Sequence, residues 1–367
     1  METLLAGLPF HMPCTYDYVL ALALAAEYYV ETCRPTLAWN FNCTAARMSQ
    51  ALGFHKTTMQ DLESLDAARR RVRLFAVIYV NDKMLSLRLG CASMRRDKEM
   101  PPDHKAMMRR GLVYDKLYSS AALRQTPEAR HDTAVGLAQE LDALLNDGCD
   151  IKPDFDKDVR NASGDEIFGL LLQGDRVSQL ALKCLIYRTL LLTAGSASTF
   201  SAECISVARR ALLEHQVVTN GLVQHESRFL ELHYNWALLM SPFAPFIVLL
   251  CNVVETYNLA DLELLGVVIE SIEAIRQSMP TISQHLRLFK PLFEVASKFV
   301  EVKTAPVPRT ENFNAFLLEA NMDLSFEPAL LSTFSQGHQP DVVSGQPGHR
   351  GTSFLDVWSY LDSSPPC

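Results

Sequence analysis

One apolar stretch, RRRVRLFAVIYVNDKMLSLRLG at positions 69–90, places the strongest constraint on the fold of this chain. Its apolar residues recur at helical spacing in two neighbouring stripes, which are Val72, Phe75, Ala76 and Tyr79 in the first and Leu74, Val77 and Ile78 in the second. Two adjacent stripes give a helix a wide apolar surface. We therefore expect a helix that is buried on most sides.

A single acid, Asp82, lies within this stretch, close to Val80 and Leu85. Burying a carboxylate is costly unless a cation and hydrogen-bond donors meet it. The sequence offers Lys83, Arg88 or Arg73 as that cation. Gly90 is predicted to end the helix, because glycine takes the left-handed conformation without a side-chain clash.

Much of the rest of the first 303 residues also has helical periodicity, with almost no alternation of period two between turns, and the polar stretch at 94–110 is interpreted as a loop. The patterns predict helices at 16–33, 36–53, 134–145, 167–193, 201–214, 261–276 and 281–303. Gly53 is predicted to cap the second of these, with His55 near its negative end. The run at 236–254 is interpreted as a buried core helix, because Pro242 and Pro245 leave it short for a membrane span. The fold class is therefore all-α.

Composition and motifs argue against several classes of function. The net charge of -8 does not suit a free-standing nucleic-acid binder, which should carry a basic face. The nine cysteines have no metal-ligand spacing, and we expect no cofactor in this chain. Cys204, in the first turn of a predicted helix, could be a reactive thiol, although a buried and inert thiol is the favoured reading. No dinucleotide, phosphate-loop or hydrolase motif is present, so we do not expect an enzyme.

Several blocks together resemble a known family. The residues that carry the resemblance in the central stretch are Arg73-Leu74-Phe75, Tyr79, Asp82, Leu85-Ser86 and Leu89-Gly90. This pattern is similar to the middle homology, or regulatory, region of fungal binuclear zinc-cluster transcription factors. Three places depart from the family pattern: Ala76 stands for tryptophan, Lys83 for arginine, and Cys91-Ala92 for Arg-Pro. A lysine offers a point charge where arginine would form a bidentate pair.

Further blocks follow in the family's order. Ala45, Met48 and the run Leu52–Lys56, which contains Gly53 and His55, resemble an earlier family block. Cys204 with Ala208-Arg209, and later Pro242-Phe243 and Asn252-Val253-Val254, resemble later blocks. The resemblance begins near Cys14, so residues 1–303 are expected to be an N-terminally truncated regulatory domain.

The composition changes at residue 304, where proline, serine and glycine become frequent among acidic residues. We expect residues 304–367 to form a mostly disordered tail. An aromatic and acidic segment within it resembles amphipathic activation segments that fold onto a coactivator. Its candidate residues are Phe354, Leu355, Trp358, Tyr360 and Leu361. A helix that docks back on the domain, or an inert tail, are the alternatives.

The resemblance implies a nuclear regulator of transcription by RNA polymerase II. In that family an N-terminal six-cysteine cluster with two zinc ions reads the DNA, and these 367 residues contain no such cluster. We therefore expect no sequence-specific DNA binding by this chain alone. The expected partners are coactivators or the transcription machinery through the tail, together with a small-molecule effector. The alternative is a helical ligand-sensing or protein-interaction module without DNA binding. An all-α enzyme would rest mainly on the buried Asp82, which structural pairing explains more simply.

Overall fold

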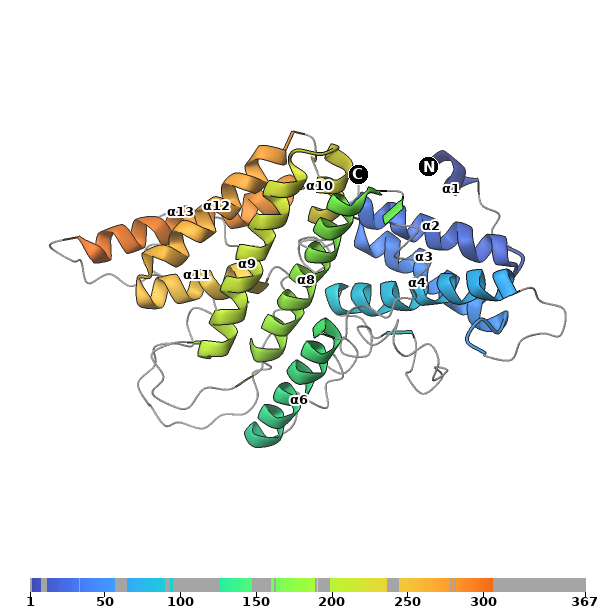
Figure 1. The fold of residues 1–367 in the computed structure, drawn as a ribbon, viewed down its shortest axis with the longest axis horizontal. Coiled ribbons are helices and arrows are strands. Elements are labelled where there is room, and N and C mark those ends of the chain that lie inside the picture. The colour runs from blue at the N-terminus through green and yellow to red at the C-terminus, as the bar shows by residue number, and fades with distance from the viewer. Residues whose placement is uncertain are drawn as a thin grey trace, which may run out of the picture. The chain divides into compact units, whose positions relative to one another are not determined.

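The computed structural model describes eleven α-helices and the segments that flank them (Figure 1). The described residues are 2–7, 12–32, 34–56, 65–89, 93–94, 126–146, 160–161, 163–188, 190, 199–235, 244–277, 279 and 282–305. All regular elements in these ranges are helices. The all-α fold class is therefore confirmed for the described part of the chain. The tail from residue 306 onward lies outside it.

The chain divides into two compact units by its internal contacts. The first comprises Met1–Gly169 with Tyr234–Ser241, and the second comprises Leu170–His233 with Pro242–Cys367. The first unit contains α1 (Glu2–Ala6), α2 (Tyr16–Glu31), α3 (Pro35–Ala51), α4 (Leu65–Leu89), α6 (Pro127–Asn146) and the start of α8 (Asp165–Arg188). The expected boundary between a domain at 1–303 and a tail at 304–367 remains a prediction.

The core of the first unit is built from α2, α3 and α4. Helix α2 packs along α3, and α3 packs against α4. Thr15 caps α2, because its side-chain oxygen accepts a hydrogen bond from the Tyr18 N–H. Pro35 opens α3 at its first turn, where its missing N–H costs no helical hydrogen bond. Small side chains let the helices approach closely, and the fully or nearly fully buried ones include Ala23, Ala45, Ala46 and Ala76.

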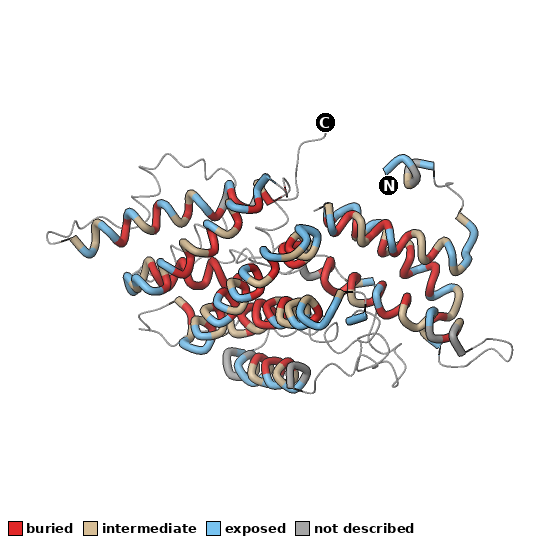
Figure 2. Tube along the Cα trace, turned by 45° about the horizontal axis from the view of Figure 1, so that its top comes forward, coloured by how far each residue is buried: buried red, intermediate tan, exposed pale blue. Residues whose placement is uncertain are grey.

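Helix α4 is the helix that the central apolar stretch predicts, although it begins four residues earlier and ends at Leu89, directly before Gly90. Its first stripe is well buried, since Phe75 and Tyr79 have no exposed surface. In the second stripe Ile78 is fully buried, but Val77 is 40% exposed. The helix is therefore buried on most sides, as expected, and Val77 is the exposed member of the two stripes. Buried positions recur between exposed and intermediate ones along α2, α3 and α4 (Figure 2).

The second unit contains most of α8 together with α9 (Ala202–Leu222), α10 (Ser227–Tyr234, with its last residue assigned to the first unit), α11 (Ala244–Thr256), α12 (Leu259–Ile275) and α13 (Ser283–Thr304). Helix α11 packs against α9, α12 and α13, and α9 and α13 each pack against α12. Residues 244–253 of α11 are all buried, so this part of the 236–254 run is a core helix, as predicted. Pro245 lies in its first turn, where a proline is tolerated. No helix in the described ranges is long and apolar enough to span a membrane.

Candidate functional site

Gly53 ends α3 with a complete set of capping hydrogen bonds. The Gly53 N–H donates to the Gln50 carbonyl at 2.9 Å, and the Phe54 N–H donates to the Ser49 carbonyl at 2.9 Å. These two bonds define the Schellman motif, which needs a residue with positive φ between them. Gly53 supplies it with φ of 73°. The structure therefore confirms the predicted cap, and His55 lies half-buried just beyond it.

The cap also fixes the aromatic side chain that follows. Phe54 is 4% exposed, and its ring centroid lies 6.0 Å from that of Tyr16 on α2. Met48, six residues earlier and near the end of α3, belongs to the same buried cluster. A contact of this kind between the residue after the glycine and the last turn of the helix commonly accompanies the motif. The Leu52-Gly53-Phe54 block thus ties the end of α3 to α2.

Three polar side chains of the central motif lie inside the first unit. Tyr79 and Lys83 are one turn apart on α4 and almost fully buried, and the Lys83 ammonium lies 5.2 Å from the Tyr79 ring centroid. This is the geometry of a cation–π contact. Asn81 donates from Nδ2 to Oε1 of Glu27 on α2 at 2.7 Å. Burial raises the pKa of Glu27, and the hydrogen bond from Asn81 opposes that rise.

A second amide joins α3 to α4. The side chain of Asn42 is fully buried and donates from Nδ2 to the Ile78 carbonyl at 3.0 Å. A buried amide without a partner would destabilise the core, so this bond specifies how α3 faces α4. Together with the Asn81–Glu27 contact, it places a polar link from α4 to each of the other two core helices.

Asp82 is fully buried, as the sequence predicted. Its Oδ2 accepts a hydrogen bond from the Ser93 hydroxyl at 2.6 Å, and its Oδ1 accepts one from the Met94 backbone N–H at 3.2 Å. The donors therefore come from a segment that returns to the helix after its end. The Arg88 side chain lies outside the described residues, so the predicted pairing of Asp82 with Lys83, Arg88 or Arg73 stays a prediction. Arg73 itself is half-buried on α4.

The remaining predicted residues lie outside the described part of the chain. They are Gly90 and the five residues of the tail segment, Phe354, Leu355, Trp358, Tyr360 and Leu361. Their roles stay predictions.

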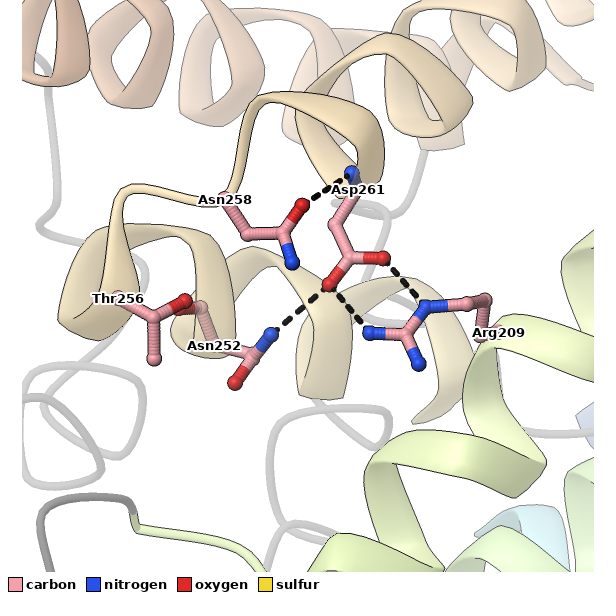
Figure 3. A network of polar contacts seen from close by, with 5 residues as sticks. All are labelled: Arg209, Asn252, Thr256, Asn258 and Asp261. Atoms are coloured by element: carbon pink, nitrogen blue, oxygen red, sulfur yellow. Dashed lines mark hydrogen bonds and ion pairs between the residues drawn. The ribbon is translucent and has the colours of Figure 1, made fainter.

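The later blocks meet in the second unit at an acid that the sequence did not single out (Figure 3). Arg209 on α9 donates from Nε to Oδ1 of Asp261 at 2.6 Å and from Nη2 to Oδ2 at 2.8 Å. Asn252 on α11 donates from Nδ2 to the same Oδ2 at 2.9 Å. Asn258 caps α12 by accepting from the Asp261 N–H at 3.1 Å. Three helices are therefore joined at the carboxylate of Asp261, which is 1% exposed.

A histidine pair lies in the same unit. Nδ1 of His215 on α9 and Nε2 of His233 on α10 are 2.9 Å apart, and the rings stack with centroids 5.0 Å apart. Burial lowers the pKa of His215 to about 4, and burial together with His215 lowers the pKa of His233 well below its ordinary value. Gly174 on α8 leaves room for the pair, since a Cβ there would lie 2.8 Å from Nδ1 of His233. Sequence spacing did not predict this pairing, because the two histidines are 18 residues apart and lie on different helices.

These polar groups are arranged to hold helices together. Within the described ranges, no group of three or more histidine, cysteine or acidic side chains is placed to hold a metal ion. The Asp82 carboxylate accepts two hydrogen bonds from the protein itself, and the Asp261 carboxylate accepts three. Carboxylates satisfied in this way stabilise a scaffold and are poorly suited to act as a general base.

Comparison with known proteins locates the family signal in the first unit. Residues 8–101 match the family model described as the fungal specific transcription factor domain. No curated protein and no solved structure gave a significant match to the chain. The matched segment contains α2, α3 and α4 with the Gly53 cap and Asp82. This family is one of transcription-factor regulatory domains and not of enzymes. Residues 8–101 of this chain are therefore similar to the fungal specific transcription factor domain, the middle regulatory domain of fungal zinc-cluster factors.

Proposed function

We propose that this chain is the regulatory part of a fungal-type transcription factor that controls transcription by RNA polymerase II in the nucleus. The observation that carries the proposal is the family match over residues 8–101, which coincides with the three-helix core of the first unit. The residues that resemble the family motif stabilise that core. Gly53 ends α3, and Asp82 receives two hydrogen bonds from the segment after α4.

In this proposal, sequence-specific DNA binding is carried out by a zinc cluster of the kind found in the family and not by these 367 residues. No Cys-(two residues)-Cys-(six residues)-Cys run occurs among the nine cysteines. The net charge of -8 also opposes tight binding to phosphates, whose affinity comes largely from lysine and arginine contacts. The tail segment around Trp358 is the proposed contact to coactivators, because aromatic residues among acids suit a segment that folds on binding.

A tethering assay tests the proposal. The chain is fused to an unrelated DNA-binding domain in a fungal host, with an RNA polymerase II reporter downstream of the matching DNA site. The intact fusion should change reporter output several-fold, and a Trp358→Ala/Leu361→Ala variant should lose most of that change. A Val342→Ala/Val343→Ala variant is the matched control, since it removes two apolar tail residues outside the segment. A folded, nuclear fusion that leaves the reporter unchanged would contradict the proposal.

A gel-shift titration tests whether these 367 residues bind a specific DNA sequence by themselves. The purified chain, without any fused domain, should bind DNA weakly and without sequence preference, and that binding should vanish as salt is raised. Specific, salt-resistant binding would show that these residues read DNA themselves. Native mass spectrometry of the chain after incubation with cell extract tests the alternative of a ligand-sensing module. In that alternative a small molecule stays bound to the chain, and the tethered reporter does not respond.

A further inference from the structure

Two cysteines of the second unit face each other where α8 ends and α9 begins. Cys184 lies four residues before the end of α8, and Cys204 is the third residue of α9, with its N–H bonded to the capping Ser201 side chain at 3.2 Å. Their sulfur atoms are 3.9 Å apart, and neither residue has exposed surface. Cys204 Sγ also approaches the Cys184 carbonyl oxygen at 3.6 Å. The two thiols are thus in direct contact across two helices.

The surroundings keep these thiols protonated. Burial, reinforced by the neighbouring Cys204, raises the pKa of Cys184 well above its ordinary value, and burial also raises that of Cys251 on α11. The positive charge of Arg188, at the end of α8, opposes the rise at both cysteines, and Glu255 adds to it at Cys251. Burial lowers the pKa of Arg188 to about 10, so the guanidinium stays charged at neutral pH. A protonated, enclosed thiol is a poor nucleophile and resists oxidation by peroxide.

We propose that Cys184 and Cys204 form a dithiol site for a trivalent arsenical, with one arsenic atom bonded to both sulfur atoms. Arsenic(III) is a soft, thiophilic centre, and sulfur atoms already in contact can bond to one such atom with small side-chain rotations. A disulfide would require the two sulfur atoms to approach to about 2.05 Å, and also an oxidant. The observed contact therefore favours the bridged site over the oxidised one.

The reaction needs no change of oxidation state. A monosubstituted trivalent arsenical in water, such as hydrated phenylarsine oxide, carries two hydroxyl groups on arsenic. Each As–O bond breaks as one As–S bond forms, and each thiol proton leaves with the departing hydroxide as water. The products are one dithioarsenite ring and two water molecules. Because the protons leave in the water, the reaction can start from protonated thiols.

The ends of the helices provide the route of entry. Helix termini open locally at a lower free energy than helix centres do. Cys184 lies in the final turns of α8 and Cys204 in the first turn of α9, so opening at this junction exposes both thiols without unfolding the unit. A bound arsenic atom then links two helices of the folded state and stabilises it by mass action.

Purified full chain and phenylarsine oxide test the proposal. Intact-mass spectrometry should show one arsenical per chain with the loss of two thiol protons, and a dithiol such as dimercaptopropanol should reverse it. After denaturation and alkylation, peptide mapping should find Cys184 and Cys204 protected in the treated chain and alkylated in the untreated chain. Because this arm uses the unmodified sequence, it does not depend on how any variant folds.

Alanine variants identify the thiols. Cys184→Ala and Cys204→Ala should each lose the bridged adduct, whereas Cys251→Ala, which removes a neighbouring buried thiol, should keep it. Cys43→Ala is a second control, on α3 in the other unit. Protection of other cysteines, an adduct that survives in Cys184→Ala and Cys204→Ala, or the absence of any adduct would overturn the proposal. So would a Cys184–Cys204 disulfide formed by peroxide in a chain that does not take up the arsenical. Since all readouts use purified protein, their failure is distinct from a failure of the tethering assay.

Discussion

Arg209 and Asp261 form a bidentate ion pair between α9 and α12, with two nearly equal N–O distances of 2.6 and 2.8 Å. The carboxylate is 1% exposed, while the arginine side chain is 40% exposed. Asn252 on α11 donates a further hydrogen bond to the Asp261 carboxylate. The pair and Asn252 therefore join α9 to the consecutive helices α11 and α12, at a point where the carboxylate has little access to water.

Replacing Arg209 should destabilise the second unit measurably. Arg209→Ala leaves the buried carboxylate with only neutral donors, and we expect a loss of about 1–3 kcal/mol in the free energy of unfolding. Arg209→Lys should recover part of that loss, because lysine cannot form both bonds. Urea unfolding followed by circular dichroism measures the change.

The matched control for that experiment is the next residue. Arg210 pairs with Glu214 one turn away at the surface, at 3.0 Å. Exposed pairs of this kind contribute little, so Arg210→Ala should cost less than about 0.5 kcal/mol. Equal losses for Arg209→Ala and Arg210→Ala would contradict the structural role of the Asp261 network.

Replacing Gly53 and Gly169 by alanine should change the free energy of unfolding in opposite directions. Gly53 has φ of 73°, so Gly53→Ala should lower stability by about 1–2 kcal/mol through backbone strain, even though a Cβ there meets only Lys56 Cδ at 3.6 Å. Gly169 is an exposed residue within α8 whose Cβ would have no neighbour within 4 Å. Gly169→Ala should raise stability by about 0.5–1 kcal/mol. Thermal unfolding of both variants in one buffer provides the comparison, and a stabilising Gly53→Ala would refute the capping geometry.

The histidine pair predicts a loss of stability in mild acid. The folded-state pKa of His215, about 4, lies below the value of about 6.5 expected for the unfolded chain. The unfolded chain therefore binds more protons below pH 6.5, and the stability that is complete above this pH falls as the pH drops towards 4. Between pH 7 and pH 5 the loss should be about 2 kcal/mol for this imidazole.

A His215→Gln variant tests the sign and the size of that effect. It should be less stable than the unchanged chain at pH 7, because its hydrogen bond with His233 is altered, yet it should lose less stability between pH 7 and pH 5. Urea unfolding at the two pH values gives the difference. Identical pH dependence in both proteins would mean that His215 is not held neutral by burial.

Local signals predicted much of the fold. The stripes of α4 and the Gly53 cap depend on residues within one or two turns of each other, and both are found in the structure. The bounds of the eight-residue α10 were not predicted, because so short a segment has little periodicity to detect. Likewise α9 continues to Leu222, eight residues beyond the predicted end at Glu214, since tertiary packing buries Val218 and Leu222 on its inner face.

The polar networks were less predictable for a physical reason. Arg209 and Asn252 were recognisable as parts of family blocks, but their shared partner Asp261 is 52 residues from the first and 9 from the second. Nothing in local periodicity couples these positions. A signal did exist, because an aspartate in the first turn after the capping Asn258 suits the positive end of a helix. That signal alone could not distinguish a buried acid from an exposed one.

The free energy of unfolding of Asp82→Asn tests most directly the claim that the motif residues of α4 serve to build the scaffold of the first unit. Asparagine keeps the shape of the side chain, but one of its two terminal groups is an NH2 donor. That donor faces either the Ser93 hydroxyl or the Met94 N–H, where the carboxylate of Asp82 offers an acceptor. We predict a loss of about 1–3 kcal/mol. An unfolding free energy equal to that of the unchanged chain would contradict the claim.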